Sequence, residues 1–294
     1  MTRIWFLLCC FVLLQVSTPV SGESDNDENC SVISLSLEGA AGLIYYPFAD
    51  RDGINPLRLS IDARGRCLFG VALLPASGAH LRGPGQPLNL SFRDRGDRVI
   101  PMNGSEQRWL QFEPAARGYT LDLVVKLPVG QARRIGDYDN TFVLRVFANG
   151  QWVRDIDFRL SARVAPQADL QLAGNAQSQL GRSAGMNFGE LEEGETLSAM
   201  LAVRANGAYN LAVASENNGQ LQHVSLKGEN TAVPYRAWLD GQQLSLQGGK
   251  DSRSFSAPEN GRRLRNISVQ IGDTKGRMAG QYRDTLRVTV TLLE

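Results

Sequence analysis

The C-terminal stretch constrains the fold of this chain more than any other segment. Apolar and polar residues alternate without interruption from 285 to 292. The apolar set is Leu286, Val288, Val290 and Leu292, and the polar set is Thr285, Arg287, Thr289 and Thr291. This period is typical of a β-strand with one buried and one solvated face. No later strand comes after it in the sequence, so we expect an open sheet edge that accepts a strand from another chain.

A related stretch occurs 144 positions earlier. The matched pairs are Gly136 with Gly280, Tyr138 with Tyr282, Thr141 with Thr285 and Val146 with Val290. Each copy comes after an alternating apolar segment, 121–127 in the first case and 267–271 in the second. The repetition predicts two related domains in tandem. We take 30–165 as domain one and 167–294 as domain two, because a short polar break begins at Pro166.

The two copies have different segments after them. Asn149 and Gly150 come soon after the first copy, and Asn-Gly is the strongest short signal for a β-hairpin because both residues tolerate positive φ. Residues 156–164 then alternate again between apolar and polar side chains. Domain one is therefore expected to supply its own last strand, whereas domain two is expected to lack one.

Length and composition fit this organisation. A chain of 294 residues is typical of about two domains, and its 30 glycines suit many turns. No amphipathic helical run of a dozen residues stands out, so the predicted class is all-β, with two β-sandwiches. The net charge is +1 and the basic residues are scattered, which gives no indication of a nucleic-acid partner.

Residues 1–22 are predicted to be a secretory signal peptide. Arg3 precedes the apolar run 4–16, and Val20, Ser21 and Gly22 offer small residues for cleavage. A membrane anchor is the alternative, but the run is short for a bilayer and Pro19 comes after it. The acidic segment 23–29 is expected to be disordered, and it has no alternating apolar residues with which to serve as a donated strand.

Two of the four cysteines would remain after export. Cys9 and Cys10 lie inside the signal peptide, which leaves Cys30 and Cys67. In an exported protein such a pair is most simply a disulfide. A metal site is the disfavoured alternative, because no further Cys or His lies nearby in the sequence.

An aromatic segment interrupts domain one. Tyr45, Tyr46 and Phe48 do not fit a simple alternating strand. One interpretation is a loop that contacts a surface or ligand. The alternative, which we favour, is a segment folded onto the core.

Two hairpins are predicted in domain two. The first joins 197–205 to 209–215 at Asn206-Gly207, and the second joins 233–239 to 244–246 at Asp240-Gly241.

The sequence does not predict an enzyme, a metal site or a cofactor. His80 and His223 are the only histidines, and neither stands in a recognisable catalytic motif. The aspartates near Asp50, Asp52 and Asp62 lack the spacing of a calcium loop.

Several motifs in domain two carry a family resemblance. They are Met186-Asn187-Phe188-Gly189, Asn206-Gly207-Ala208-Tyr209, Val233-Pro234-Tyr235 and Gly280-Gln281-Tyr282-Arg283-Asp284-Thr285 before the final alternating strand. In this order they resemble the spore-coat-protein-U-like domain, the pilin-type domain of archaic chaperone–usher pili. The resemblance covers domain two well and domain one loosely. The chain differs from that family in one respect. Pilin domains of this kind often carry a disulfide, and domain two has no cysteine.

The resemblance implies an immunoglobulin-like fold that lacks its last strand, with Leu286, Val288, Val290 and Leu292 as the acceptor edge. A periplasmic chaperone would lend a strand, and the next pilin subunit would replace it at an outer-membrane usher. The chain would then be an adhesive or structural fimbrial subunit, with a complete first domain at the tip, exported to the periplasm and then to the cell surface. The alternative is a free-standing secreted coat or carbohydrate-binding protein.

Overall fold

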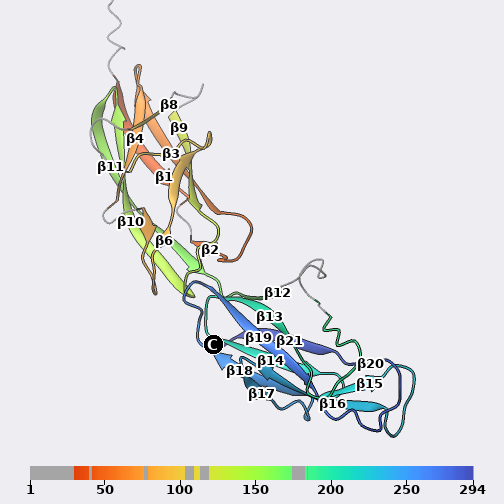
Figure 1. Cartoon of the computed structure of the whole chain (residues 1–294). Helices are drawn as coiled ribbons and strands as arrows, with labels where there is room; N and C mark the ends of the chain where they lie inside the picture. Colours follow the sequence, from red (N-terminus) through yellow and green to blue (C-terminus); the bar gives the residue numbers. More distant parts are fainter. Residues whose placement is uncertain are drawn as a thin grey trace, which may run out of the picture.

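The computed structural model describes residues 30–39, 42–75, 79–102, 109–112, 119–173, 183 and 185–293. The predicted signal peptide and acidic segment lie outside these ranges. Figure 1 shows the described residues as two β-sandwiches placed end to end. The regular elements in these ranges are all strands, and none of the described residues belongs to a helix long and apolar enough to cross a membrane. The prediction of an all-β chain is confirmed.

Domain one is a sandwich of two main sheets. Its strands are β1 (Ser31–Glu38), β2 (Leu43–Tyr45), β3 (Gly53–Arg64), β4 (Phe69–Pro75), β5 (His80–Leu81), β6 (Leu88–Asn89), β7 (Ser91–Asp94), β8 (Leu110–Phe112), β9 (Tyr119–Leu127), β10 (Gly136–Ala148) and β11 (Gln151–Val164). One sheet has the order β1-β3-β9-β7, and the other has the order β2-β11-β10-β4-β8. The short strands β5 and β6 form a separate pair.

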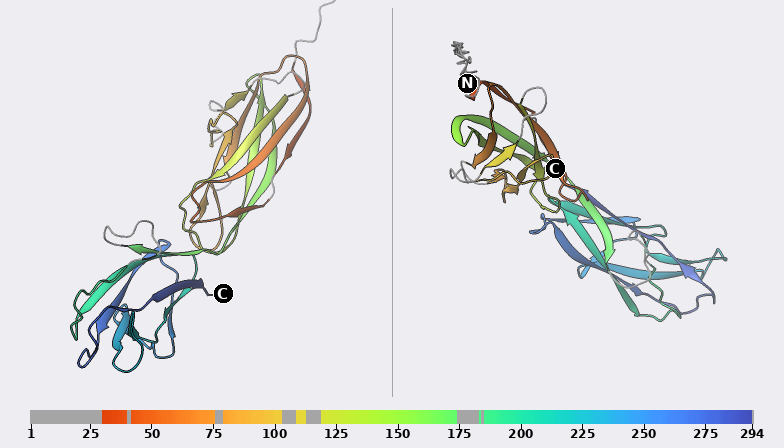
Figure 2. Two further views of the ribbon diagram at one scale, coloured as in Figure 1. Left: turned by 90° about the vertical axis from the view of Figure 1, so that its right-hand side faces the viewer. Right: turned by 90° about the horizontal axis from the view of Figure 1, so that it is seen from above.

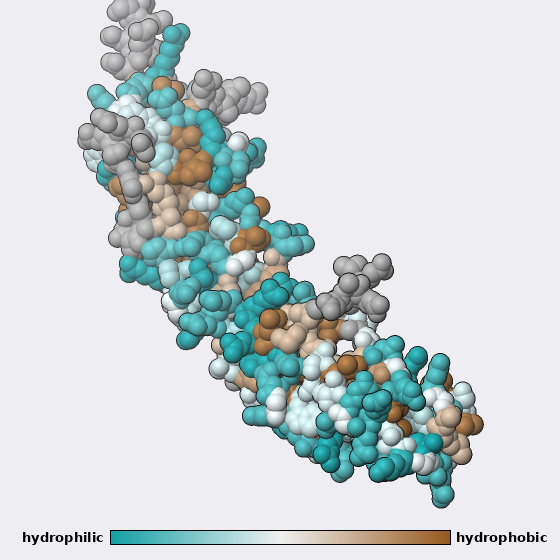
Figure 3. Space-filling view, in the orientation of Figure 1, coloured by the Kyte–Doolittle hydropathy of each residue, from teal (hydrophilic) through white to brown (hydrophobic). Residues whose placement is uncertain are grey.

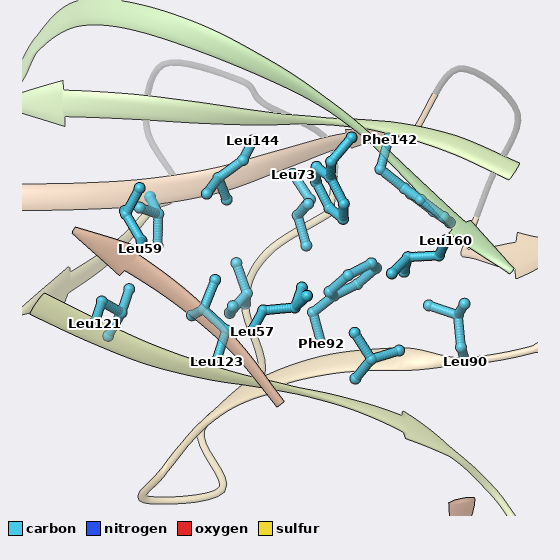
Figure 4. Close-up of a cluster of buried hydrophobic side chains, with 14 of the residues drawn as sticks. Leu57, Leu59, Leu73, Leu90, Phe92, Leu121, Leu123, Phe142, Leu144 and Leu160 are labelled. Carbon is cyan, nitrogen blue, oxygen red and sulfur yellow. The ribbon is translucent and has the colours of Figure 1, made fainter. Parts of the chain in front are cut away.

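The core of domain one fills the space between these sheets. Figure 4 shows Phe92 of one sheet facing Phe142 and Leu160 of the opposite sheet. Alternation places one face of each strand inward, so these side chains leave water together and stabilise the sandwich. A disulfide joins Cys30, just before β1, to Cys67, just before β4. The predicted pairing is confirmed, and it ties the two sheets together.

The hairpin predicted at Asn149-Gly150 is also confirmed. Both residues have positive φ, 50° and 80°, and they join β10 to β11 in antiparallel register. Strand β10 therefore has a partner on each side, β11 on one and β4 on the other.

Domain two is built on the same plan. Its strands are β12 (Ala168–Ala173), β13 (Thr196–Ala205), β14 (Tyr209–Ser215), β15 (Gln220–His223), β16 (Ala232–Leu239), β17 (Gln242–Leu244), β18 (Lys250–Phe255), β19 (Arg262–Ile271), β20 (Tyr282–Arg283) and β21 (Leu286–Leu292). One sheet has the order β12-β13-β19-β16-β15-β20, with β17 added beside β16. The other sheet has three strands in the order β18-β14-β21.

The sheet orders of the two domains correspond strand by strand. The series β12-β13-β19-β16 repeats β1-β3-β9-β7, and β18-β14-β21 repeats β8-β4-β10. The pairing registers agree as well, because Leu144 opposite Leu73 in domain one corresponds to Val288 opposite Val213 in domain two. Among the described residues of domain two, no strand takes the place that β11 has in domain one.

The two hairpins predicted in domain two have different outcomes. Asp240 and Gly241 have positive φ and join β16 to β17, so that prediction is confirmed. The hairpin predicted at Asn206-Gly207 is wrong, because β13 and β14 belong to different sheets. The segment between them crosses from one sheet to the other.

The Asn206 side chain makes hydrogen bonds at the junction between the domains. It is only 5% exposed, donates a hydrogen bond to the carbonyl of Ala165 (2.8 Å) and accepts one from the N–H of Gln167 (2.8 Å). A buried amide is stable only with such partners. The side chain therefore ties the linker between the domains to domain two.

Two glycines bring the domains into close contact. A Cβ atom at Gly207 would lie 2.9 Å from Cδ1 of Ile135, and one at Gly261 would lie 2.3 Å from the Cβ of Ala132. A larger side chain at Gly261 would require the backbone near Ala132 to move, whereas one at Gly207 would require the end of the Ile135 side chain to move. Both views in Figure 2 show the domains joined end to end at this junction.

Candidate strand-acceptor edge

Strand β21 lies at the edge of a sheet. Its residues pair with β14 in antiparallel register, from Leu292 opposite Tyr209 to Leu286 opposite Ser215. On its other side, no strand among the described residues pairs with it. An unpaired edge presents backbone N–H and C=O groups to any incoming strand.

The inward-facing side chains of β21 are incompletely covered. Leu286, Val288, Val290 and Leu292, the acceptor edge, are only half-buried against the core of domain two. At the matched positions of β10, Phe142, Leu144 and Val146 are 0% exposed. The difference is explained by β11, whose Phe158 and Ile156 lie directly opposite Phe142 and Leu144 and pack with the core of domain one. These four side chains thus form an apolar face that no described strand covers in the way that β11 covers β10.

A second half-buried strand faces the acceptor edge across the sandwich. β12 is the edge of the other sheet and is in contact with β21. Its Leu170 and Leu172 are partly buried, as the apolar residues of β21 are. In Figure 3 apolar residues gather on the surface of domain two over the region where Figure 1 places β12 and β21. An added strand would cover both sets.

The opposite edge of the three-stranded sheet is protected. β18 alternates in the same way, but its half-buried positions include Asp251 and Arg253, which form an ion pair (2.7 Å). Charged residues on an edge strand disfavour pairing with another chain. Of the two edges of this sheet, only β21 is suited to accept a strand.

A polar network fixes the start of β21. The Asp284 carboxylate accepts hydrogen bonds from the Ser215 hydroxyl (2.7 Å), from the backbone N–H of Asn217 (3.1 Å) and from the Tyr235 hydroxyl. Burial, and then the bond to the Asp284 carboxylate, raise the pKa of Tyr235 above its usual value. Both effects favour the neutral phenol, which is the form that donates to Asp284.

The other end of β21 lies at the domain junction. Leu292 is beside Gly207, which in turn abuts Ile135 of domain one. Figure 1 accordingly places the C-terminal end of the chain near the junction and β20 at the far end of domain two. Strand β21 therefore runs toward domain one.

Two of the three aromatic residues in this segment of domain one, Tyr45 and Phe48, make contacts within the protein. Tyr45 is 2% exposed, donates to the carbonyl of Pro128 (2.8 Å) and accepts from the N–H of Gln131 (3.0 Å). A surface-contact role for Tyr45 is therefore wrong, and its burial raises its pKa. The interpretation of this residue as part of the core is the correct one.

The neighbouring aromatic residues lie elsewhere. Phe48 belongs to the domain junction, where its N–H donates to Gln167 Oε1 (2.9 Å) and the Arg204 guanidinium lies 5.4 Å from its ring centre. Its contact role is with domain two rather than with an outside surface. Tyr46 alone of the three has an exposed side chain.

Each of the two histidines makes hydrogen bonds within its own domain. The Nδ1 atom of His223 accepts from the N–H of Leu226 (2.9 Å), and the backbone carbonyl of His80 accepts from Asn140 (2.8 Å). The described residues contain no group of three or more His, Cys, Asp or Glu side chains placed to hold a metal ion.

Comparisons with known proteins found neither a matching family model nor a curated protein similar in sequence. Among solved structures, the chain matches one in the CsuC–CsuE chaperone–tip adhesion subunit pre-assembly complex from archaic chaperone–usher Csu pili of Acinetobacter baumannii. The identity is 14% and the TM-score 0.48, over 87% of this chain and 99% of that chain.

Two further matches are of the same kind. One is the CupB6 tip adhesin from Pseudomonas aeruginosa, with 12% identity and a TM-score of 0.36 over 90% of this chain and 94% of that one. The other is self-complemented MyfA, the major subunit of Myf fimbriae from Yersinia enterocolitica. It has 18% identity and a TM-score of 0.31, over 45% of this chain and 98% of that one. These structural neighbours of the chain are tip adhesins and a fimbrial subunit.

Proposed function

We propose that the chain is an adhesive subunit of a chaperone–usher fimbria, in which domain two is completed by a strand from another polypeptide. The observation that supports this most directly is the difference between β10 and β21. The two strands match in sequence and in register, but only β10 has a second partner strand among the described residues. In place of that partner, β21 presents four half-buried apolar side chains and an unpaired backbone edge.

Domain one supplies a template for the incoming strand. β11 is antiparallel to β10, and its Phe158 and Ile156 lie opposite Phe142 and Leu144, the counterparts of Leu286 and Val288. A donated strand would take the same direction beside β21, with apolar residues at every second position to meet the acceptor edge. Its backbone would pair with the open side of β21.

The direction of β21 supports a position at the fibre tip. Because β21 runs toward domain one, an antiparallel donor would begin at the junction and leave domain two at its far end. The body of the donating subunit would then lie beyond domain two, away from domain one. Further subunits would extend the fibre in that direction and leave domain one at the free end.

The same proposal specifies the partners and the location. A periplasmic chaperone would cover the acceptor edge before assembly, an outer-membrane usher would receive the complex, and another pilin subunit would supply the final strand. The chain would pass through the periplasm to the cell surface. Its role is structural and adhesive rather than catalytic.

A hydrogen-exchange experiment tests strand acceptance. Residues 23–294 are mixed with a peptide that has the sequence of 151–164, and amide exchange in β21 is compared with and without the peptide. We expect exchange to slow at least about tenfold, because free edge amides become hydrogen-bonded. The control peptide carries Asp in place of Ile156 and Phe158, the positions that lie opposite Leu144 and Phe142 in domain one. Amides in β21 that are already as protected as those in β10 before any peptide is added would contradict the proposal.

A further inference from the structure

We propose that Trp109, Phe147 and Trp152 form an aromatic platform at the free end of domain one that binds the ring face of a carbohydrate. The inference deepens the proposed adhesive function and rests on it, since it names the class of receptor. It also moves the expected contact region away from Tyr45, Tyr46 and Phe48.

The three aromatic residues lie together on the outer face of one sheet. Phe147 and Trp152 are cross-strand partners beside the β10–β11 turn, so their side chains leave the same face of the sheet. Trp109 stacks on Phe147, with ring centres 4.8 Å apart and planes inclined by 24°. Figure 1 shows this turn at the end of domain one opposite domain two.

The exposed part of the platform consists of Trp152 and the partly exposed Trp109, because Phe147 is only 3% exposed and stacks against Trp109. Trp152 is 61% exposed, yet its Nε1–H donates to Asp155 Oδ1 (3.0 Å). Asp155 is held in turn by two hydrogen bonds from Arg145, of 2.9 and 2.8 Å. An exposed indole without such a bond would change rotamer freely, whereas this one is oriented before a ligand arrives.

The missing side chain at Gly70 leaves room for the Trp109 indole. This ring passes over Gly70, where an added Cβ would lie 2.3 Å from the Cδ1 atom of Trp109. Any larger residue at position 70 would lift the indole from the sheet and separate it from Phe147. The absence of a side chain at Gly70 keeps the Trp109 ring against the sheet, stacked on Phe147.

The polar groups beside the platform favour a sugar over an apolar partner. A pyranose ring presents C–H groups on its face, which pack on an indole, and hydroxyl groups at its rim. Asp155 and Arg145 lie beside Trp152 and offer acceptors and donors at that rim. The hydrogen bonds from Arg145 lower the pKa of Asp155, so its carboxylate is ionised at neutral pH. An apolar partner large enough to cover the platform would also desolvate this ion pair without replacing its contacts with water.

A glycan array tests the proposal with residues 23–294, with and without the 151–164 peptide. We expect the protein to bind at least one class of neutral glycan. Trp152→Ala should weaken that binding roughly fivefold to tenfold, the loss expected for removing one aromatic stacking partner. Trp152→Phe should keep most of it, because a ring remains. Tyr46→Ala is the matched control, since it removes an exposed aromatic side chain outside the platform and should change nothing.

Three results would overturn the proposal. The first is that the protein binds no glycan on the array. The second is that Trp152→Ala binds glycans as well as the unchanged protein does. The third is that the protein binds polystyrene beads, an apolar surface, and no glycan. Thermal melting shows whether Trp152→Ala is folded, and a folded variant is expected because the side chain is largely exposed.

Hydrogen exchange in β21 is measured on the same samples and does not involve Trp152. A protein that accepts the peptide but binds no glycan would refute the platform alone, and one that binds glycans but not the peptide would refute the fimbrial assembly alone.

Discussion

At the scale of single residues, Tyr235 links the stability of domain two to pH. Its folded-state pKa is raised by burial and by the bond to Asp284, above the ordinary value of 10.0. A group with a raised folded pKa contributes its full stability below its unfolded pKa and loses it as pH rises further. Domain two should therefore lose stability above about pH 10. We expect Tyr235→Phe to reduce this loss, as measured by thermal melting of domain two between pH 8 and pH 11. Tyr46→Phe, at an exposed position, should leave the pH dependence unchanged.

Asn206 gives a second prediction at this scale. Asn206→Ala removes both side-chain hydrogen bonds to the linker and leaves the Ala165 carbonyl and the Gln167 N–H without them. Loss of buried partners costs roughly 1–3 kcal/mol, so the unfolding free energy of domain two should fall by about that amount. Chemical denaturation measures the change. The exposed Gln171→Ala, on neighbouring β12, is the control, and an equal effect there would show that Asn206 has no special role.

These residues show why local sequence signals were insufficient in places. Asn206-Gly207 has the sequence of a tight turn, but its partners are Ala165 and Gln167 in the linker. Tyr45 could have been a surface residue, and only its contacts with Pro128 and Gln131, more than 80 positions away in the chain, show that it is buried. Hydrogen bonds at such separations leave no periodic pattern in the sequence.

At the scale of elements, β21 can be tested by its two faces. Asp at both Val288 and Val290 places charges on the half-buried face, where burial of an unpaired charge is strongly unfavourable. We expect this variant to lose capture of the 151–164 peptide, and of a chaperone, while domain one stays folded. Asp at both Thr289 and Thr291 adds the same charge to the same strand on its exposed face. Peptide capture should persist in that control, and loss in both variants would indicate general destabilisation of the strand.

Alternation predicted these elements well. The alternating segment 121–127 lies within β9, the segment 209–215 corresponds to β14, and the Asn149-Gly150 turn lies between β10 and β11 as expected. Strand existence can be predicted from a period of two that any half-buried strand must show. Sheet order cannot, because pairing of β12 with β13 and of β21 with β14 depends on contacts distant in sequence. The sequence did not predict the Trp109–Phe147–Trp152 platform for that reason, since Trp109 comes from a segment distant in sequence from the β10–β11 hairpin.

At the scale of the whole molecule, the disulfide should matter for domain one only. Cys30 and Cys67 are separated by 37 positions, and closing a loop of that size contributes about 3–4 kcal/mol. We expect a variant with Ser at both positions to lower the unfolding free energy of domain one by about that amount. Denaturation followed by the fluorescence of Trp109 and Trp152 measures it. Peptide capture by β21 should be unchanged, and a loss of capture would indicate that the two domains do not act independently.

If domain two lacks one strand, supplying that strand in the same polypeptide should stabilise it, and a chimera tests this. In the chimera, residues 167–292 are joined directly to the sequence of 149–164. The turn and strand that come after β10 are thereby reproduced after β21. The added strand would cover the acceptor edge, and each of its buried apolar side chains contributes about 1.5–3 kcal/mol, partly offset by the ordering of the strand. A second chimera carries Asp at the positions of Ile156 and Phe158, which would lie opposite Val288 and Leu286.

The measurement is the thermal melting of residues 167–294, of the chimera and of its Asp variant. We predict that the chimera is soluble and monomeric and melts cooperatively, and that the unmodified domain and the Asp variant aggregate or melt at a much lower temperature. A soluble, monomeric unmodified domain that melts cooperatively at the same temperature as the chimera would contradict the account. A free-standing secreted protein would then be the better description of the chain.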